Sequence, residues 1–160
     1  MKKICVYSRN EIQNMLEPPT EPHLIVSINC PDEGPAKIRT NNATLGRASL
    51  FFWDLDQLPK AGSFVFNGKE MIPAEEVKEE HLVKVSDAKA IIDLVEAHPE
   101  WETLLVHCTA GISRSSAVAA ALHKIFNGSD EAIFGKRCFR PNMRVYRMVL
   151  EEWHSRQPQE

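Results

Sequence analysis

The chain has 160 residues, of which 43% are hydrophobic and 26% are charged, and its formal net charge at pH 7 is −3. This length and composition are typical of one globular domain with its own hydrophobic core, so we expect residues 1–160 to form a single domain. The weak negative charge excludes a general electrostatic attraction to nucleic acid or to anionic membranes, and any anion must be bound by local groups.

The N-terminal segment is basic but lacks the long apolar stretch of a signal peptide, and no stretch of the sequence is apolar enough to span a membrane. The cysteines have neither the spacing of a disulfide framework nor the Cys-x-x-Cys step of a zinc or redox site, and the histidines show no metal-ligand spacing. We therefore expect a cytoplasmic protein with free thiols, no metal and no cofactor. The four cysteines are Cys5, Cys30, Cys108 and Cys138.

Short apolar segments alternate with helical patterns along the chain. Four of these segments are rich in Ile, Leu, Val and Phe, as is usual for strands that are covered on both faces. The alternation predicts an α/β fold with a mostly parallel central sheet flanked by helices. The predicted strands are 4–7, 24–29, 49–53 and 103–107.

A hairpin is predicted between the third and fourth of these strands. Residues 63–72 contain the pair Asn67-Gly68, which is a strong signal for a tight hairpin turn. We expect this segment to leave the sheet and to lie near one of its edges.

Helical patterns dominate the second half of the chain. The first has apolar residues at a period close to 3.6 and stops at Pro99, the second is rich in Ala and stops at Gly128, and the third follows Pro141. The predicted helices are 79–98, 113–126 and 142–155, with a shorter one within 129–138 that is capped by Ser129.

One motif carries recognisable chemistry. Residues 107–115 read His-Cys-Thr-Ala-Gly-Ile-Ser-Arg-Ser and lie between the last predicted strand and the Ala-rich helix. The pattern His-Cys-x-x-Gly-x-x-Arg-Ser fixes five positions, so a chance match is on the order of one in a few million per starting point. A loop of this length, at the positive end of a helix, can wrap its backbone N–H groups around one phosphate.

Each fixed residue has a physical role in such a loop. Gly111 supplies the backbone freedom that a tight curl requires. The amides and the helix dipole stabilise the thiolate of Cys108 as a nucleophile, and Arg114 can bind two phosphoryl oxygens at once. Ser115 can donate to the sulfur when a phosphocysteine intermediate breaks down, and His107 orders the loop. The predicted phosphate-binding residues are Thr109, Ala110, Gly111, Ile112, Ser113 and Arg114.

A carboxylic acid is needed to protonate the leaving oxygen of a phosphate ester. Asp54 and Asp56 both follow a predicted strand, where the carboxyl ends of parallel strands border the ligand cleft. Residues two apart share one face of a strand, so periodicity does not choose between them. Asp87 and Asp93 fall within a predicted helix and are poorer candidates.

The run VHCTAGISRSS resembles the signature loop of protein tyrosine phosphatases, in the HCxAGxSRS form of the dual-specificity branch. The likeness extends loosely over the last third of the chain, and Phe52-Trp53-Asp54-Leu55 resembles the strand end that carries the general acid in small bacterial members. The resemblance implies hydrolysis of phosphomonoesters through a phosphocysteine intermediate, without metal. It also implies that Cys108 is the nucleophile, Arg114 the phosphate clamp and Asp54 the general acid.

The sequence departs from that family in two respects. Asp54 lies further before the Cys than in most dual-specificity members, which makes residues 57–80 an insertion near the active site. No segment matches the loop that holds the phosphotyrosine ring in the larger classical enzymes. Phosphotyrosine and phosphoserine or phosphothreonine in proteins therefore both remain candidate substrates, as do small phosphomonoesters.

Several alternatives remain open at this stage. Basic residues at 136–147 keep a phosphoinositide or an RNA 5′-phosphate as candidate substrates, although a solvated surface is the commoner reason for such a run. A catalytically weak phosphate-binding module is the runner-up, and sulfur transfer fits the loop less well. Cys30 or Cys138 could protect Cys108 through a reversible disulfide. The sequence does not predict an oligomeric state.

Overall fold

The computed structural model describes residues 1–66 and 70–158. Its strands are β1 (Lys3–Ser8), β2 (His23–Asn29), β3 (Thr44–Phe51), β4 (Phe64–Phe66), β5 (Met71–Pro73) and β6 (Thr103–Cys108). Its α-helices are α1 (Arg9–Gln13), α2 (Val85–Ala97), α3 (Arg114–Asn127), α4 (Glu131–Phe134) and α5 (Met143–Ser155), and single 3-10 turns lie at Ala74–Glu76 and Glu79–His81.

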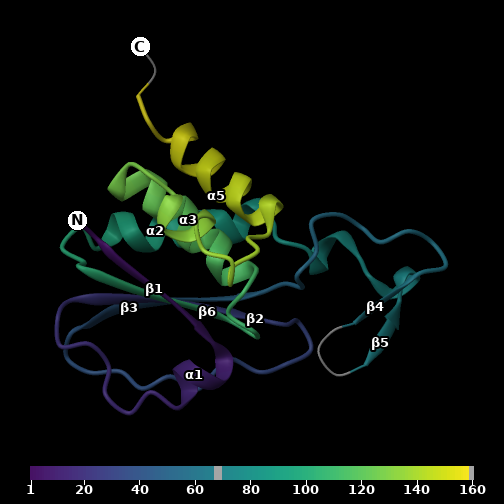
Figure 1. The fold of residues 1–160 in the computed structure, drawn as a ribbon, viewed down its shortest axis with the longest axis horizontal. Helices are drawn as coiled ribbons and strands as arrows, with labels where there is room; N and C mark the ends of the chain where they lie inside the picture. The colour runs from purple at the N-terminus through teal and green to yellow at the C-terminus, as the bar shows by residue number, and fades with distance from the viewer. Residues whose placement is uncertain (67–69, 159–160) are drawn as a thin grey trace.

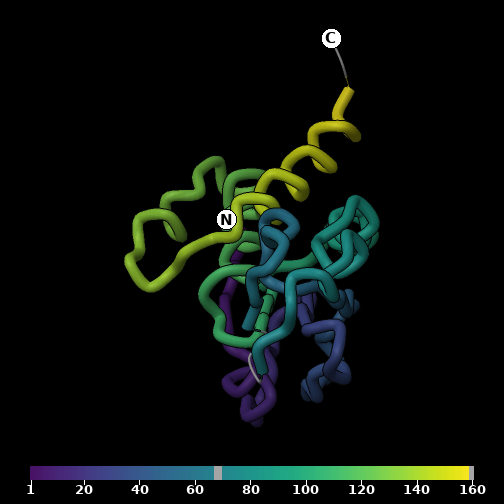
Figure 2. The backbone as a smooth tube through the Cα atoms, turned by 90° about the vertical axis from the view of Figure 1, so that its right-hand side faces the viewer, coloured from purple at the N-terminus to yellow at the C-terminus, as the bar shows by residue number. Residues whose placement is uncertain are grey.

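The central sheet has four strands in the order β1-β6-β2-β3, and all of its pairs are parallel. Helices α2, α3 and α5 cover one face of this sheet, and α1 lies against the other (Figure 1). The predicted α/β class, with a parallel sheet flanked by helices, is confirmed. Seen from the side, α5 rises away from the sheet (Figure 2).

Both faces of the two central strands are buried, as their continuous apolar sequences predict. The larger cluster packs between the sheet and the three long helices and includes Leu24, Val26, Leu104, Val106 and Val118. A smaller cluster forms under α1 from Ile12, Ile25 and Leu105. Because the strands are parallel, their carboxyl ends meet at one edge of the sheet, where β6 ends at Cys108 and β2 at Asn29.

The helix predicted at 79–98 begins six residues later than expected, so the prediction was wrong for residues 79–84. The carbonyl of His81 accepts a hydrogen bond from the amide of Trp53 (2.7 Å), and the carbonyl of Val83 accepts from Arg144. These carbonyls are used by other elements and cannot build a first helical turn. The α-helix instead begins at Val85, where the carboxylate of Asp87 accepts from the amide of Lys84 (2.8 Å).

Two further elements differ from the prediction. The third strand spans 44–51 rather than the predicted 49–53. The sequence did not reveal its first half, with Gly46 and Arg47, because this part lies at an edge of the sheet and lacks a continuous apolar pattern. Helix α1 was not predicted. Its signal is the capping box between Ser8 and Glu11, which the sequence displays as Ser-x-x-Glu.

The predicted hairpin is present as β4 and β5, which pair antiparallel outside the central sheet (Figure 1). The turn pair Asn67-Gly68 that suggested it lies outside the described residues. In the described part of the chain, no helix is both long enough and apolar enough to cross a membrane.

Candidate active site

The loop between β6 and α3 curls tightly at the carboxyl edge of the sheet. Gly111 has a φ of +73°, a conformation that favours glycine. A Cβ atom at this position would lie 2.8 Å from the amide nitrogen of Ser8 and 2.9 Å from the carbonyl carbon of Tyr7. The loop therefore packs directly against the end of β1, and glycine is required there both for conformation and for space.

The carbonyls and amides of this loop differ in their partners. Three of the carbonyls bond to the surrounding protein: Thr109 accepts from the amide of Arg9 (3.2 Å), Ile112 from Arg140 (3.0 Å) and Ser113 from Asn142 (3.0 Å). In the described part of the chain, by contrast, no protein group accepts a hydrogen bond from the amides of residues 109–113. A run of unpaired amides at a helix N-terminus is suited to bind an anion.

Cys108 lies at the start of this curl and is 2% exposed. Its Sγ lies 3.0 Å from the Oγ of Ser115, in the first turn of α3. A hydroxyl at this distance can donate to a sulfur that carries negative charge. The arrangement fits the predicted role of Ser115.

Arg114 is 4% exposed and is held from three directions. Its Nη1 donates to the carbonyl of Phe52 (2.7 Å) and lies 3.6 Å from the Sγ of Cys30, and its Nη2 donates to the Oγ1 of Thr109 (2.9 Å). These contacts fix the plane of the guanidinium beside the loop. A fixed guanidinium presents two parallel N–H groups, which a lysine ammonium cannot do.

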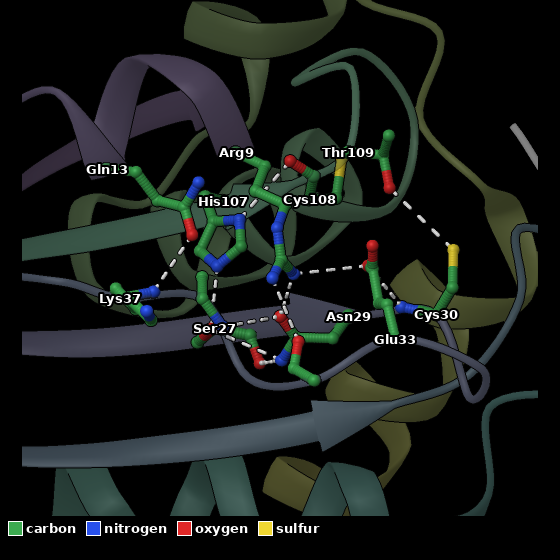
Figure 3. A network of polar contacts seen from close by, with 12 residues as sticks. Arg9, Gln13, Ser27, Asn29, Cys30, Glu33, Lys37, His107, Cys108 and Thr109 are labelled. Carbon is green, nitrogen blue, oxygen red and sulfur yellow. Dashed lines mark hydrogen bonds and ion pairs between the residues drawn. The ribbon is translucent and has the colours of Figure 1, made fainter.

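His107 is fully buried on the α1 side of the sheet (Figure 3). Its Nδ1 donates to the carbonyl of Cys108 (3.2 Å), and its Nε2 accepts from the hydroxyl of Ser27 (2.6 Å). Burial lowers the pKa of His107 to about 4, and the positive charges of Arg9 and Arg47 add to this effect. The neutral ring therefore orients the peptide that begins the loop.

The stability of the protein should depend on pH through His107. The unfolded ring binds a proton below its ordinary pKa of 6.5, whereas the folded ring does so only near 4, so the free energy of unfolding falls as the pH is lowered through this window. In urea unfolding, His107→Asn should lose less stability than wild type between these pH values. The exposed His154 provides the control, because His154→Asn should keep the wild-type slope; equal slopes in all three proteins would contradict the prediction.

The two candidate acids differ in their contacts around the loop. Asp54 Oδ1 accepts from the Oγ of Ser113 (2.8 Å) and from the Nδ2 of Asn142 (2.9 Å), so this carboxylate lies at the rim of the loop. Both Asp54 and Asp56 are exposed. Asp54 also lines the cavity that contains Arg114, whereas Asp56 borders only a neighbouring depression with Arg140.

A cavity of about 260 Å³ opens above the loop. Its floor is formed by Thr109, Ala110 and Arg114, and its walls are mainly apolar. Two wall residues, Val65 and Phe66, come from strand β4, within the segment 57–80 that the sequence marked as an insertion. Whether that segment is an insertion relative to the dual-specificity phosphatases stays a prediction. The lining is Cys30, Trp53, Asp54, Leu55, Val65, Phe66, Thr109, Ala110 and Arg114.

Sequence reasoning did not place Asn142 or Cys30 in the site. Asn142 caps α5 by accepting from the amides of Arg144 and Val145, and its side-chain amide donates to Asp54. Cys30 was considered only as a redox partner, and its buried side chain lines the cavity. No local pattern marks either role, because both depend on tertiary contacts.

The basic run and the exposed cysteine that the sequence singled out have other surroundings. In the basic run at 136–147, Arg144 donates to the carbonyl of Val83 and pairs with Glu79, so it fixes the start of α2. Cys138 is exposed, and a disulfide from Cys108 to it or to Cys30 stays a prediction. Among residues 1–66 and 70–158, no group of three His, Cys, Asp or Glu side chains has the arrangement of a metal site.

Comparisons with known proteins give structural matches alone. No protein-family model matches the chain, and no curated protein sequence matches it significantly. PTPMT1 in complex with PI(5)P superposes with a TM-score of 0.53 at 15% identity, covering 96% of this chain and 91% of that one. The human tyrosine phosphatase-like serine/threonine/tyrosine-interacting protein superposes with a TM-score of 0.48 at 18% identity, covering 83% of this chain and 76% of that one. Tk-PTP in the active form superposes with a TM-score of 0.45 at 14% identity, covering 98% of this chain and 95% of that one.

The likeness to PTPMT1 extends over nearly the whole chain, and it shows that the chain has the fold of the PTP-like phosphatases. The resemblance inferred from residues 107–115 is therefore confirmed at the level of the fold.

Proposed function

We propose that this chain is a cysteine-dependent phosphatase that hydrolyses phosphomonoesters through a phosphocysteine intermediate. The observation that carries the proposal is the loop itself: a run of amides without an acceptor among the described residues lies between the buried thiol of Cys108 and the fixed guanidinium of Arg114. Phosphoryl transfer requires mainly a positioned nucleophile and compensation of charge on the phosphoryl oxygens, and this loop supplies both.

The reaction proceeds in two displacements. The thiolate of Cys108 attacks phosphorus while the bond to the leaving oxygen breaks, and Asp54 donates a proton to that oxygen. Water then attacks phosphorus, Asp54 takes up its proton, and the sulfur–phosphorus bond breaks. Ser115, 3.0 Å from the sulfur, stabilises the departing thiolate. His107 does not touch the substrate; it positions the Cys108 peptide.

The cavity walls favour phosphotyrosine in proteins as the substrate. Trp53, Leu55, Val65 and Phe66 flank the predicted phosphate position and can pack against an aromatic ring. A lipid phosphate is the second candidate, since PTPMT1, which shares the fold, is in complex with PI(5)P.

Release of inorganic phosphate from a phosphotyrosine peptide, in a buffer that contains a chelator, tests the proposal. No turnover of this peptide or of a generic aryl phosphate would leave only a phosphate-binding module.

The general acid can be assigned with two substrates of different leaving group. Asp54→Asn should lower kcat for a phosphotyrosine peptide by about 10²–10⁴-fold, because tyrosine is a poor leaving group without a proton. The loss should be much smaller for para-nitrophenyl phosphate, whose leaving oxygen is already stable as an anion. Asp56→Asn is the matched control at the same strand end. A large, substrate-dependent loss in Asp56→Asn alone would instead assign the acid to Asp56.

A further inference from the structure

A second cavity lies on the α1 side of the sheet and contains no residue of the Cys108 loop. Its volume is about 560 Å³, roughly twice that of the cavity above the loop. Arg47 reaches it from β3; the preceding residue, Gly46, faces Leu94 of α2, so Arg47 points to the opposite face of the sheet. The cavity is lined by Gln13, Ala36, Lys37, Ile38, Arg39 and Arg47.

Three cationic side chains meet in this cavity without an acidic counterpart. Among residues 1–66 and 70–158, no carboxylate forms an ion pair with Lys37, Arg39 or Arg47. A bound anion would supply the counterion that these three positive charges lack.

Arg47 is a fixed donor rather than a mobile surface group. Its Nε donates to the Oγ of Ser49 (3.0 Å), and its Nη2 donates to the carbonyl of Ala36 (2.8 Å) and to the Oγ of Ser27 (3.3 Å). Burial lowers the pKa of its guanidinium below the ordinary value, and the charge of Arg9 adds to the effect. A partly desolvated charge held in one position binds an anion more strongly than a solvated one.

The exposed cations lie on the segment that closes the cavity. Gln13 Oε1 accepts from the amide of Lys37 (2.9 Å), a contact visible in Figure 3, and Nη1 of Arg39 donates to the carbonyl of Met15 (3.3 Å). These bonds anchor the 37–39 segment to α1 and the residues that follow it. They leave the ammonium of Lys37 available to a ligand.

We propose that the cavity between α1 and β3 is a second anion-binding site, which takes a small molecule carrying two or more phosphate groups. Three cations exceed what a single phosphate requires, and the volume has room for a larger anion. The ligand is held by Arg47 at the base of the cavity and by Lys37 and Arg39 at its mouth. This site is separate from the proposed catalytic one, so it stands whether or not the chain is a phosphatase.

Inorganic pyrophosphate is the probe, and amide NMR spectra of the full chain are the readout, because they report the two cavities separately. Pyrophosphate should shift the amides of 36–39 and 46–48 in a saturable way. The double variant Lys37→Ala/Arg39→Ala should weaken this binding by about tenfold or more, while shifts at 109–113 persist. The matched control, Arg137→Ala/Arg147→Ala, removes the same charge from exposed positions elsewhere and should leave the affinity unchanged.

Three results would overturn the proposal. One is the absence of saturable shifts at 36–39 and 46–48 in the wild type. Another is an equal loss of affinity in the control variant, since binding would then follow total charge alone. The third is equal affinity for pyrophosphate and orthophosphate, which would reject a ligand with several phosphate groups.

Discussion

Replacement of Cys108 by Ser should abolish turnover of phosphomonoesters, with a loss of more than about a thousandfold in kcat. Serine has nearly the same shape as cysteine, so the buried position should remain filled and the contact with Ser115 should remain possible. Its hydroxyl, however, is not ionised near neutral pH and is a far weaker nucleophile than a thiolate. Steady-state release of phosphate measures the loss, and rapid acid quenching with radiolabelled substrate detects the covalent phosphoenzyme.

The exposed Cys138 provides the control for this experiment. Cys138→Ser should retain wild-type turnover and should still form the labelled phosphoenzyme. If Cys108→Ser kept its activity, or if the label still appeared in that variant, the nucleophile would be another residue and the proposed mechanism would be wrong. Circular dichroism of both variants separates a chemical loss from a loss of fold.

Arg114→Lys should lower kcat by about 10²–10³-fold while the protein stays folded. Lysine keeps the positive charge, but it cannot donate two parallel hydrogen bonds to the phosphoryl oxygens in the transition state. It also leaves the carbonyl of Phe52 and the hydroxyl of Thr109 without the fixed donor that they now share. Because the lost bonds strengthen as charge develops, the effect should fall mainly on kcat rather than on KM.

Arg147 is the matched control, since it is an exposed arginine on α5 and Arg147→Lys should leave kcat unchanged. A thermal unfolding curve shows how much of the Arg114 effect comes from the buried contacts. If Arg114→Lys retained wild-type kcat, a point charge would suffice at this position and the guanidinium geometry would be irrelevant.

The parts of the fold that were predicted correctly are those whose signals are local. Strands β2 and β6 are continuous apolar runs, and α3 and α5 have a clear helical period with recognisable ends. The start of α2 could not be predicted in this way, because the carbonyl of Val83 bonds to Arg144, far along the chain. The first half of β3 was missed because an edge strand pairs on one side alone and can carry Arg47 among its residues.

The residues of the candidate site also differ in whether a local signal could predict their positions. Cys108 and Arg114 belong to one contiguous loop, so nine residues of sequence were sufficient to predict their proximity. The contact between Asp54 and Asn142 joins a residue that follows β3 to the residue that caps α5, and periodicity on one strand did not predict it or separate Asp54 from Asp56. The approach of Phe66 to the cavity likewise depends on where the β4–β5 hairpin lies relative to the Cys108 loop.

The strand order also constrains how the protein is made. Strand β1 pairs with β6 and not with β2, so the first hundred residues of a growing chain hold two strands whose shared neighbour has not yet been synthesised. Until β6 emerges, β1 and β2 have unpaired edges, which are prone to associate with other chains. The strand that closes this gap is the one that ends at Cys108. The sheet is therefore completed by the same segment that positions Cys108, so a nascent chain presents this thiol at the edge of a complete sheet only once β6 has paired with β1 and β2.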